Sequence, residues 1–582
     1  MDPRPNLLVV ITDDQGYGDL GCLGNPQLQT PHLDALHGES VRLTDFHVGP
    51  TCAPTRASLL TGHHANSTGV WHTIGGRSLL REHEWTLADA LRDHGYRTGL
   101  FGKWHLGDAP PYRPEDRGFD TVVRHGGGGI SQTPDYWGND YFDDTYFVDG
   151  EPKRFEGYCT DVWFDCAMDF AEHAGEAPYF CWLAPNAPHG PLNVEDRWVE
   201  PYRAMMPEPR ARFFGMIANI DHNVGRLRRR LAELGQDRDT VLVFMTDNGT
   251  ASGCDLDAEE FVTDGYNAGM RGIKGSPYDG GHRVPVFIHY PAGGLTDARD
   301  VTPPAHAVDF MPTMLELCGA TPPADRRFHG TSIAPSIRGG SQLELADRLL
   351  VTDSQRVPDP VKWKDSCVIF RRWRLIRGQE LYDLETDPEQ RRDVAGEHPD
   401  LVTRLREGYE QWWALVGDRF EQPIPFTLPT QAGERVRLTA HDWRNDDCVL
   451  PWNQGMIRNG LRSDGAWEIR VDKPGRYRFA LYRWPSEAGH AVTDGIDGDD
   501  VAWRRDAVAE DSWTMYTGGV ALTFEHAHLT LGQQTLDGAV PADAACVEFE
   551  MDLADGATTL AAAFSGTEVG RIGAYYVEVE RA

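Results

Sequence analysis

The residues that most narrow the chemistry of this chain are Cys52-Ala53-Pro54-Thr55-Arg56, which lead directly into the helix-like segment 57–62. A cysteine in such a motif is a candidate source of a nucleophile. Taken alone, however, the motif is better explained by a buried thiol beside a helix-starting proline. Its interpretation therefore depends on residues elsewhere in the chain.

Two pairs of oxygen-bearing side chains each follow an apolar stretch typical of a buried strand. Asp13-Asp14 come after Leu7 to Ile11, and Asp247-Asn248 come after Val241 to Met245. In open α/β sheets, ligands bind at the carboxyl ends of the strands. A lone Asp-Asp would more often be a helix cap or a turn. Two such pairs together with the cysteine motif predict an all-oxygen site for a hard divalent ion, calcium or magnesium.

Cationic and imidazole side chains follow other strand-like stretches. Lys103 and His105 follow one of them, His189 follows another, and Lys274 lies in a segment that contains several glycines. Lysines can offset the repulsion between an anionic ester and an attacking oxygen, and histidine transfers protons near neutral pH. Each of these residues alone would more often be an ordinary core or surface residue.

The order of these motifs resembles that of type I sulfatases, the formylglycine-dependent members of the alkaline phosphatase superfamily. The resemblance covers roughly residues 5 to 415. It implies that a maturation enzyme oxidises Cys52 to formylglycine, whose hydrate is the nucleophile. It also implies that the metal is held by Asp13, Asp14, Asp247 and Asn248, with residue 52 completing the set.

For the remaining motif positions, the resemblance implies roles in binding and in proton transfer. Lys103 and Lys274 would bind the sulfate oxygens. Arg56 would steady the formylglycine, His105 would act on its second hydroxyl, and His189 would contact the leaving-group side.

Two positions bear on how closely the chain follows this family. Formylglycine-dependent phosphonate monoester hydrolases tend to have histidine where this chain has Asn248, so Asn248 favours sulfate esters. The sulfatase pattern often has glutamate where Asp279 stands, a departure that affects the loop geometry and not the charge.

The substrate is less well defined by the sequence than the reaction. Aromatic residues beside polar groups in segment 135–141 favour a carbohydrate sulfate over an aryl sulfate. The glycine run 126–129 is typical of a mobile lid or of surface packing. Other candidate specificity residues are His63-His64, Trp71-His72 and Arg77.

Two alternative functions remain open at this point. One is a formylglycine-dependent phosphonate monoester or phosphodiester hydrolase, which would release phosphate or phosphonate where a sulfatase releases sulfate. The other is a catalytically silent protein that binds glycans through residues 420–582. The complete sets of acidic and cationic side chains argue against the silent protein.

Apolar stretches alternate with segments of helical periodicity, which predicts an α/β fold with a mostly parallel sheet flanked by helices. The resemblance implies the alkaline-phosphatase-like form of this fold. Strands are predicted at 7–11, 179–183, 241–245 and 286–289, and helices at 85–94, 161–173, 213–234 and 305–318.

The chain is too long for one ordinary core, so several domains are expected. We expect a catalytic α/β domain over 1–350, a small sheet-plus-helix (α+β) subdomain over 351–418 and an accessory β-sandwich over 419–582. In the last of these, alternating segments 467–471 and 476–481 flank a turn and predict a hairpin. Its tryptophans are more simply explained as core residues than as glycan contacts.

The chain has 582 residues and a formal charge of −33. This charge argues against nucleic acid and anionic membrane surfaces as partners, and it favours small or oligomeric sulfated substrates over long polyanions. Ten cysteines without a close pair indicate buried thiols, not a zinc cage or a disulfide framework.

The first residues, Met1 to Asn6, lead straight into an apolar strand and leave no room for a signal peptide. No apolar stretch is long enough to predict a membrane span. We expect a cytoplasmic protein, or a periplasmic or secreted one if the sequence was trimmed.

Overall fold

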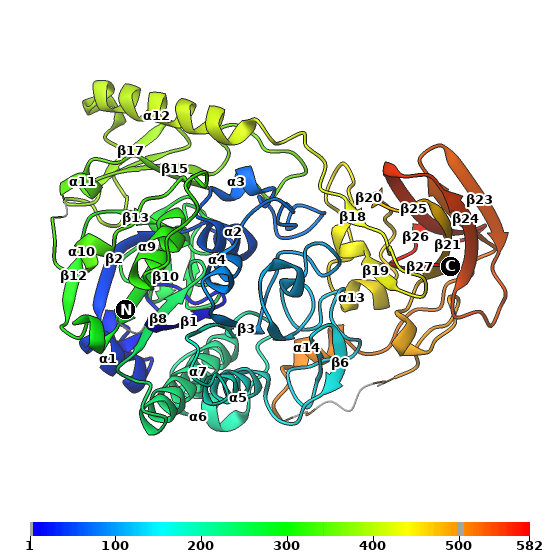
Figure 1. Cartoon of the computed structure of the whole chain (residues 1–582), viewed down its shortest axis with the longest axis horizontal. Coiled ribbons are helices and arrows are strands. Elements are labelled where there is room, and N and C mark those ends of the chain that lie inside the picture. Colours follow the sequence, from blue (N-terminus) through cyan, green and yellow to red (C-terminus); the bar gives the residue numbers. More distant parts are fainter. Residues whose placement is uncertain (1–3, 342, 499, 501–503, 505) are drawn as a thin grey trace.

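The computed structural model describes residues 4–341, 343–498, 500, 504 and 506–582. A large central sheet has helices on both faces, and a smaller sheet with one long helix lies beside it (Figure 1). Two further sheets form the C-terminal region. The predicted α/β fold class with additional β structure at the C-terminus is confirmed.

Parallel pairing dominates the middle of the central sheet, where β1 lies between β7 and β8, and β3 lies between β7 and β4. Antiparallel strands lie toward both sides. The strand order is β12 (Arg299–Val301), β2 (Val41–His47), β11 (Arg283–His289), β8 (Thr240–Thr246), β1 (Asn6–Thr12), β7 (Tyr179–Ala184), β3 (Arg97–Gly102), β4 (Thr121–Arg124), β5 (Thr145–Val148) and β6 (Glu151–Arg154), and β13 (Ala305–His306) also pairs with β2.

Helices cover both faces of this sheet, and alternate residues of β1 therefore enter two different cores. Leu7 and Val9 pack in one core, and Leu8 and Val10 pack in the other. This double burial explains why the strand is apolar throughout. The first core includes α2 (Cys52–Thr61), α4 (Leu87–Asp93) and α9 (Phe310–Leu317), and the second includes α1 (Pro31–Gly38), α5 (Cys159–Glu172), α6 (Asp196–Arg203) and α7 (Glu208–Glu233).

The predicted helices at 85–94, 161–173 and 213–234 are confirmed as α4, α5 and α7. The fourth predicted helix, 305–318, is only partly correct. Its first residues form β13 and a short 3-10 turn, and α9 begins at Phe310. The short strand pairs with β2, so tertiary pairing overrides the helical periodicity there.

Strand β11 differs in direction from what its composition suggested. Its apolar run is typical of a parallel strand buried on both faces, but it runs antiparallel to both β2 and β8. An apolar run reports burial on both faces and carries no information about direction, so the sequence pattern could not distinguish the two cases.

A smaller antiparallel sheet follows the central one along the chain. Its strands are β14 (Leu350–Asp353), β15 (Ser366–Phe370), β16 (Trp373–Ile376) and β17 (Glu380–Asp383). One face packs against α12 (Pro399–Gly417), where Leu405 and Tyr409 contact the same core as Val368 and Leu375. The strands and the helix expected in this segment are thus present.

The C-terminal region contains two sheets around a shared apolar core. One sheet has the order β18 (Phe426–Thr427), β20 (Ala466–Val471), β25 (Gly556–Gly566), β22 (His526–Leu531) and β23 (Gln534–Ala539), with β26 (Gly570–Gly573) beside β25. The other has the order β19 (Arg435–Thr439), β27 (Tyr576–Arg581), β21 (Gly475–Tyr482) and β24 (Val547–Leu553). Trp467 and Ile469 of the first sheet share a core with Phe479 and Val577 of the second.

The hairpin predicted over 467–481 is wrong, although both of its strands are present. β20 pairs with β18 and β25, whereas β21 pairs with β24 and β27 in the other sheet. The turn at 472–474 therefore connects two sheets. Alternating residues on β20 and β21 are buried between the sheets, and this burial pattern is the same in a hairpin and in a sandwich.

In the described part of the chain, no helix is both long enough and apolar enough to cross a membrane. All ten cysteines are free thiols, six of them buried. The expectation of unpaired cysteines is therefore confirmed.

Candidate active site

Four predicted ligands lie at one edge of the central sheet because they follow two adjacent parallel strands. Asp13 and Asp14 come directly after β1, and Asp247 and Asn248 come directly after β8. All four side chains are buried. The backbone N–H of Asp14 donates to Asp247 Oδ1 at 3.1 Å, which joins the two strand ends.

Helix α2 begins with Cys52 and brings the cysteine motif to the same edge. Every residue of this helix is buried, and Cys52 itself is 2% exposed. Cys52 Sγ, a carboxylate oxygen of Asp13 and a carboxylate oxygen of Asp247 lie within 4.8 Å of one another. The structure thus brings together residues that are about 195 positions apart in the sequence.

Three cationic side chains pair with the three carboxylates. Lys103 Nζ lies 2.7 Å from Asp13 Oδ2, and Lys274 Nζ lies 2.7 Å from Asp14. Arg56, one helical turn after Cys52, donates to Asp247 Oδ2 at 2.7 Å. Lys103 and Arg56 are fully buried, whereas Lys274 is 17% exposed and lies toward solvent.

Asp13, Asp14, Asp247 and Asn248, referred to below as the acidic set, can hold a metal cation in addition to the three cationic side chains. Asp13 Oδ1 and Asn248 Oδ1 are buried without a hydrogen-bond partner. Burial and the neighbouring Asp13 carboxylate raise the pKa of Asp247 to about 6, although Arg56 opposes that shift. A divalent ion would satisfy the unpartnered oxygens and reduce the repulsion between carboxylates.

Cys52 is not poised as a thiolate. Burial raises the pKa of its thiol, and the nearby Lys103 and Lys274 only partly offset this effect. The thiolate is the reactive form of cysteine, so the unmodified side chain is a poor nucleophile at neutral pH.

His105 is a neutral imidazole with a free lone pair. Its Nε2 lies 2.9 Å from the Thr73 carbonyl oxygen, so Nε2 carries the proton and donates it. The other ring nitrogen, Nδ1, is buried without a partner. Burial and the charge of Lys103 place its pKa well below the usual value. This tautomer can accept a proton at Nδ1.

His189 lies at the outer side of the acidic set, 18% exposed, with Nε2 3.7 Å from Asp14 Oδ2. Its Nδ1 donates to the Gly190 carbonyl oxygen at 2.6 Å. Burial lowers its pKa to about 4, with the Asp14 carboxylate opposing and Lys274 reinforcing the shift. An anionic substrate beside Nε2 would raise this pKa and favour the protonated ring.

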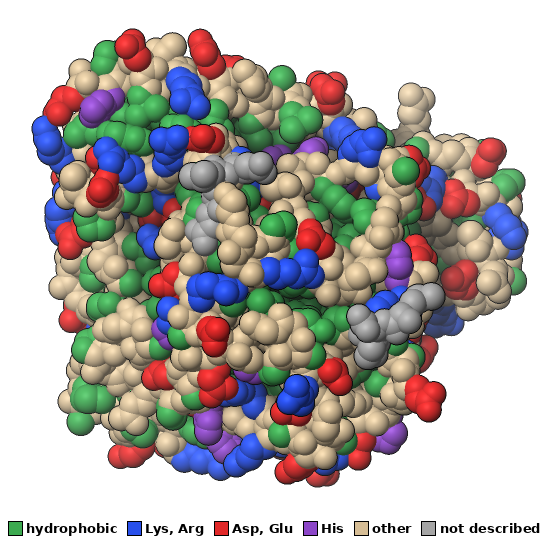
Figure 2. All heavy atoms as spheres, turned by 60° about the vertical axis from the view of Figure 1, so that its left-hand side comes forward, with side chains coloured by type: hydrophobic (Ala, Val, Ile, Leu, Met, Phe, Trp, Pro, Cys, Tyr) green, Lys and Arg blue, Asp and Glu red, His purple; other side chains and the backbone are tan. Residues whose placement is uncertain are grey.

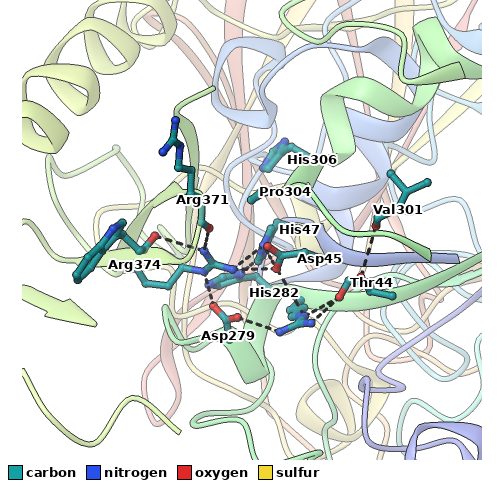
Figure 3. A network of polar contacts seen from close by, with 12 residues as sticks. Thr44, Asp45, His47, Asp279, His282, Val301, Pro304, His306, Arg371 and Arg374 are labelled. Atoms are coloured by element: carbon teal, nitrogen blue, oxygen red, sulfur yellow. Dashed lines mark hydrogen bonds and ion pairs between the residues drawn. The ribbon is translucent and has the colours of Figure 1, made fainter. Parts of the chain in front are cut away.

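A second polar cluster, which the sequence analysis missed, is formed by His47, Asp279, His282 and Arg374 (Figure 3). His47 Nδ1 and His282 Nδ1 are 3.0 Å apart, and Asp279 lies close enough to form a possible ligand set with them. Arg374 of β16 instead neutralises the cluster, with Nε 2.9 Å from Asp279 Oδ1 and Nη2 2.8 Å from Asp45 Oδ1. We therefore interpret it as a structural ion network. The sequence analysis named Asp279 as a departure from the sulfatase pattern, but nothing in the sequence pointed to His282 or Arg374 as its partners.

The end of α2 packs against a cluster of histidines. His64 stacks on His329 with ring centroids 5.1 Å apart, and its backbone N–H donates to His329 Nδ1 at 3.0 Å. Burial lowers the pKa of His329 to about 4 and that of His306 to about 3. His63 and His64, considered as specificity residues, thus pack against His329, and His64 also contacts Trp412 of α12.

Because these histidines are buried in the neutral form, we expect the free energy of unfolding to fall in acid. Folded His329 stays neutral down to about pH 4, whereas in the unfolded chain it binds a proton below about pH 6.5. The stability that the fold gains from burying neutral His329 is therefore fully present above pH 6.5 and is lost as the pH falls toward 4. His329→Asn keeps an acceptor for the His64 N–H. Urea unfolding should show a wild-type free energy that falls more steeply than that of the variant, by about 1.4 kcal/mol per pH unit. Parallel curves would contradict the prediction.

Basic and acidic side chains are interspersed on one face of the molecule (Figure 2). On the face shown in Figure 2, Lys and Arg side chains lie among Asp and Glu side chains. Near the candidate site, the cations Lys103, Lys274 and Arg56 equal the carboxylates in number. The side chains of the candidate site are therefore balanced in charge, and the overall charge of −33 is not concentrated there.

Comparisons with known proteins agree with this geometry. The family model described as Sulfatase matches residues 5–320. N-acetylgalactosamine-6-sulfatase of Canis lupus familiaris is 29% identical over 485 residues, 77% of this chain and 87% of that protein. Arylsulfatase of Klebsiella aerogenes is 30% identical over 415 residues, 55% of this chain and 88% of that protein. The crystal structure of Ps i-CgsB in complex with k-i-k-neocarrahexaose has a TM-score of 0.62 and 25% identity, and the match covers 71% of this chain and 98% of that chain.

The chain belongs to the sulfatase family, with its alkaline-phosphatase-like fold. Within that class it is a sulfuric ester hydrolase, as its arylsulfatase and carbohydrate sulfatase relatives are. The family generally uses a metal ion and formylglycine, and the buried cluster of Asp13, Cys52 and Asp247 is consistent with both.

Proposed function

We propose that this protein hydrolyses a carbohydrate sulfate monoester through formylglycine derived from Cys52 and a divalent ion, calcium or magnesium. The observation that carries the proposal is the position of Cys52 at the start of α2, close to the carboxylates of Asp13 and Asp247 and to the cations Lys103 and Lys274. Formylglycine and the ion would supply a polarised oxygen nucleophile, which a buried neutral thiol cannot provide.

The ion would be held by Asp13, Asp14, Asp247 and Asn248. Their carboxylate and amide oxygens are the ligands that calcium and magnesium prefer, and two of these oxygens are buried without a partner. The amide of Asn248 already donates to Asp14 Oδ1 at 3.0 Å, which leaves its carbonyl oxygen free to face an ion.

The cationic side chains would bind and orient the sulfate group. Burial alone would lower the pKa of Lys274, but Asp14 together with Cys52 and Asp13 raises it, so this ammonium group remains charged. Lys103 is buried beside Asp13 on the other side of the acidic set. Fixed positive charges of this kind stabilise the negative charge that develops in the transition state.

The two histidines would move protons at different points of the site. His189 Nε2 faces the outer side, where the alcohol of the ester would depart, and a bound anion favours its protonated form. His105 Nδ1 has a free lone pair in the interior and can accept a proton there. The same enzyme therefore has an acid and a base in distinct environments.

The preference for a carbohydrate sulfate is supported by relatives. The N-acetylgalactosamine-6-sulfatase match covers 77% of this chain, more than the 55% covered by the Klebsiella arylsulfatase match. Ps i-CgsB was crystallised with an oligosaccharide. An aryl sulfate remains the alternative substrate class.

The proposal is tested by two measurements on protein produced together with a formylglycine-generating enzyme. Peptide mass spectrometry should show an aldehyde at residue 52. Sulfate release from 4-nitrophenyl sulfate should exceed phosphate release from 4-nitrophenyl phosphate, and N-acetylgalactosamine 6-sulfate tests the carbohydrate class. Faster release of 4-nitrophenol from bis(4-nitrophenyl) phosphate or from a 4-nitrophenyl phosphonate monoester than from 4-nitrophenyl sulfate would favour the phosphonate or phosphodiester hydrolase. An intact thiol in protein that still releases sulfate would contradict the proposed nucleophile.

A further inference from the structure

The glycine run considered as a lid belongs to a loop, residues 126–141, that is fixed by its own side chains. Asp135 accepts hydrogen bonds from the backbone N–H groups of Gly126 and Ser131, each at 3.0 Å. The N–H of Gly128 donates to Gln132 Oε1 at 2.7 Å. These bonds hold the glycine amides in one conformation, which is not what a mobile lid requires.

This loop lies against both catalytic histidine candidates. Gly128 is so close to the His105 ring that a Cβ at residue 128 would lie 2.2 Å from its Cε1 atom. A Cβ at Gly129 would lie 3.5 Å from His189 Nδ1, and the Tyr141 hydroxyl donates to the His189 carbonyl oxygen at 2.9 Å. The loop position therefore sets the space available to both imidazoles.

The C-terminal region holds the same loop from outside through Gln454, the first residue of α13 (Gln454–Arg458). Gln454 is 1% exposed. Its Nε2 lies 3.3 Å from the Gln132 carbonyl oxygen and 3.2 Å from that of Tyr136, and also contacts that of Asp135. Its Oε1 accepts from the Gly138 N–H at 3.1 Å, and its backbone N–H donates to the Ser131 carbonyl oxygen at 3.0 Å.

Neighbouring residues of the C-terminal region add contacts on both sides of the site. The Thr133 N–H donates to the Trp452 carbonyl oxygen at 3.0 Å. On the other side, the Gly75 N–H donates to the His441 carbonyl oxygen at 2.8 Å, and the His441 ring lies 6.3 Å from the His105 ring. The C-terminal region thus contacts the surroundings of His105 at two separate places, through Trp452 on one side and through His441 on the other.

We propose that Gln454 is a positioning residue for sulfate ester hydrolysis and that segment 441–454 of the C-terminal region is a structural wall of the active site. A primary amide suits this place because it donates to carbonyl oxygens and accepts from an N–H at the same time. The inference rests on the roles proposed above for His105 and His189. By this inference, the C-terminal region contributes to catalysis by holding loop 126–141 in place. This role differs from binding glycans away from the active site.

The test compares Gln454→Glu and Gln454→Met with the matched control Gln534→Ala in the full-length, matured enzyme. Glutamate keeps the size of the side chain but places an anion against three carbonyl oxygens, and methionine removes all four side-chain hydrogen bonds without adding charge. Gln534 is exposed on β23. We expect kcat for aryl sulfates to fall about 10- to 100-fold in both Gln454 variants with KM changed less than about threefold, and no change in the control.

A double-mutant comparison separates positioning from general damage to the fold. In a His189→Ala background, the Gln454 variants should lose much less additional activity than in the wild type, because the loop acts partly through His189. Equal fold-losses in both backgrounds, or wild-type kcat in both Gln454 variants, would overturn the inference. The proposed function is judged separately, by sulfate release from the wild-type enzyme and its loss in His189→Ala.

Discussion

Replacing Cys52 with alanine is expected to reduce sulfate release by about ten-thousandfold or more while leaving the fold intact. Cys52 is the proposed source of the nucleophile, and its side chain is 2% exposed among the acidic and cationic groups of the site. Alanine fits the space of cysteine, so the loss reports chemistry and not packing. Initial rates on 4-nitrophenyl sulfate with the purified variant provide the measurement.

The control for this prediction is a second buried free cysteine. Cys318 is fully buried beyond the end of α9 and is not part of the candidate site. Cys318→Ala should retain activity close to that of the wild type. Substantial turnover by purified Cys52→Ala would contradict the proposed nucleophile, even if residue 52 carries an aldehyde in the wild type.

Replacing Arg374 with methionine is expected to cost about 3 to 5 kcal/mol of unfolding free energy. Arg374 is 1% exposed and lies between Asp279 and Asp45 (Figure 3). Burial alone would raise the pKa of Asp279, but Arg374, His47, His282 and Arg283 together lower it, with Arg374 the largest of the four, so the carboxylate is charged. Methionine would leave the buried Asp279 carboxylate and the mostly buried Asp45 carboxylate without their main cation. Urea unfolding at neutral pH measures the loss.

The neighbouring Arg372 offers a matched control. It is 49% exposed and pairs with Asp383 and with Glu385, which is itself exposed. Because exposed pairs contribute little, Arg372→Met should change the unfolding free energy by less than about 1 kcal/mol. A loss of less than about 1 kcal/mol in Arg374→Met would mean that the buried network does not hold the two sheets together.

The Arg374 network also explains how the small sheet supports the catalytic site. Asp45 and His47 lie in β2, a few residues before Cys52, and Asp279 lies a few residues after Lys274. Arg374 therefore links the segments that carry the proposed nucleophile and Lys274, one of the cations proposed to bind sulfate. The aspartate at 279, which departs from the common family pattern, still forms the ion pair.

Most of the candidate site could be recognised from the sequence because its residues occur in short local motifs. Asp13 and Asp247 follow apolar strands, which predicts an oxygen-ligand site, whereas the roles expected of Cys52 and Arg56 come from the resemblance of their motif to that of sulfatases. Parallel pairing of β1 with β8 then brings the acidic residues together, as expected for the carboxyl ends of neighbouring strands.

The direction of β11, the separation of β20 and β21 into two sheets, and the contacts of Arg374 and Gln454 were decided by the tertiary structure alone. Arg374 meets Asp279 across 95 positions, and Gln454 meets the loop around Gln132 across 322 positions. Periodicity and motifs record which side of an element is buried and which residues share a turn. They do not record which distant element covers that side, because this depends on packing among all the elements of the fold.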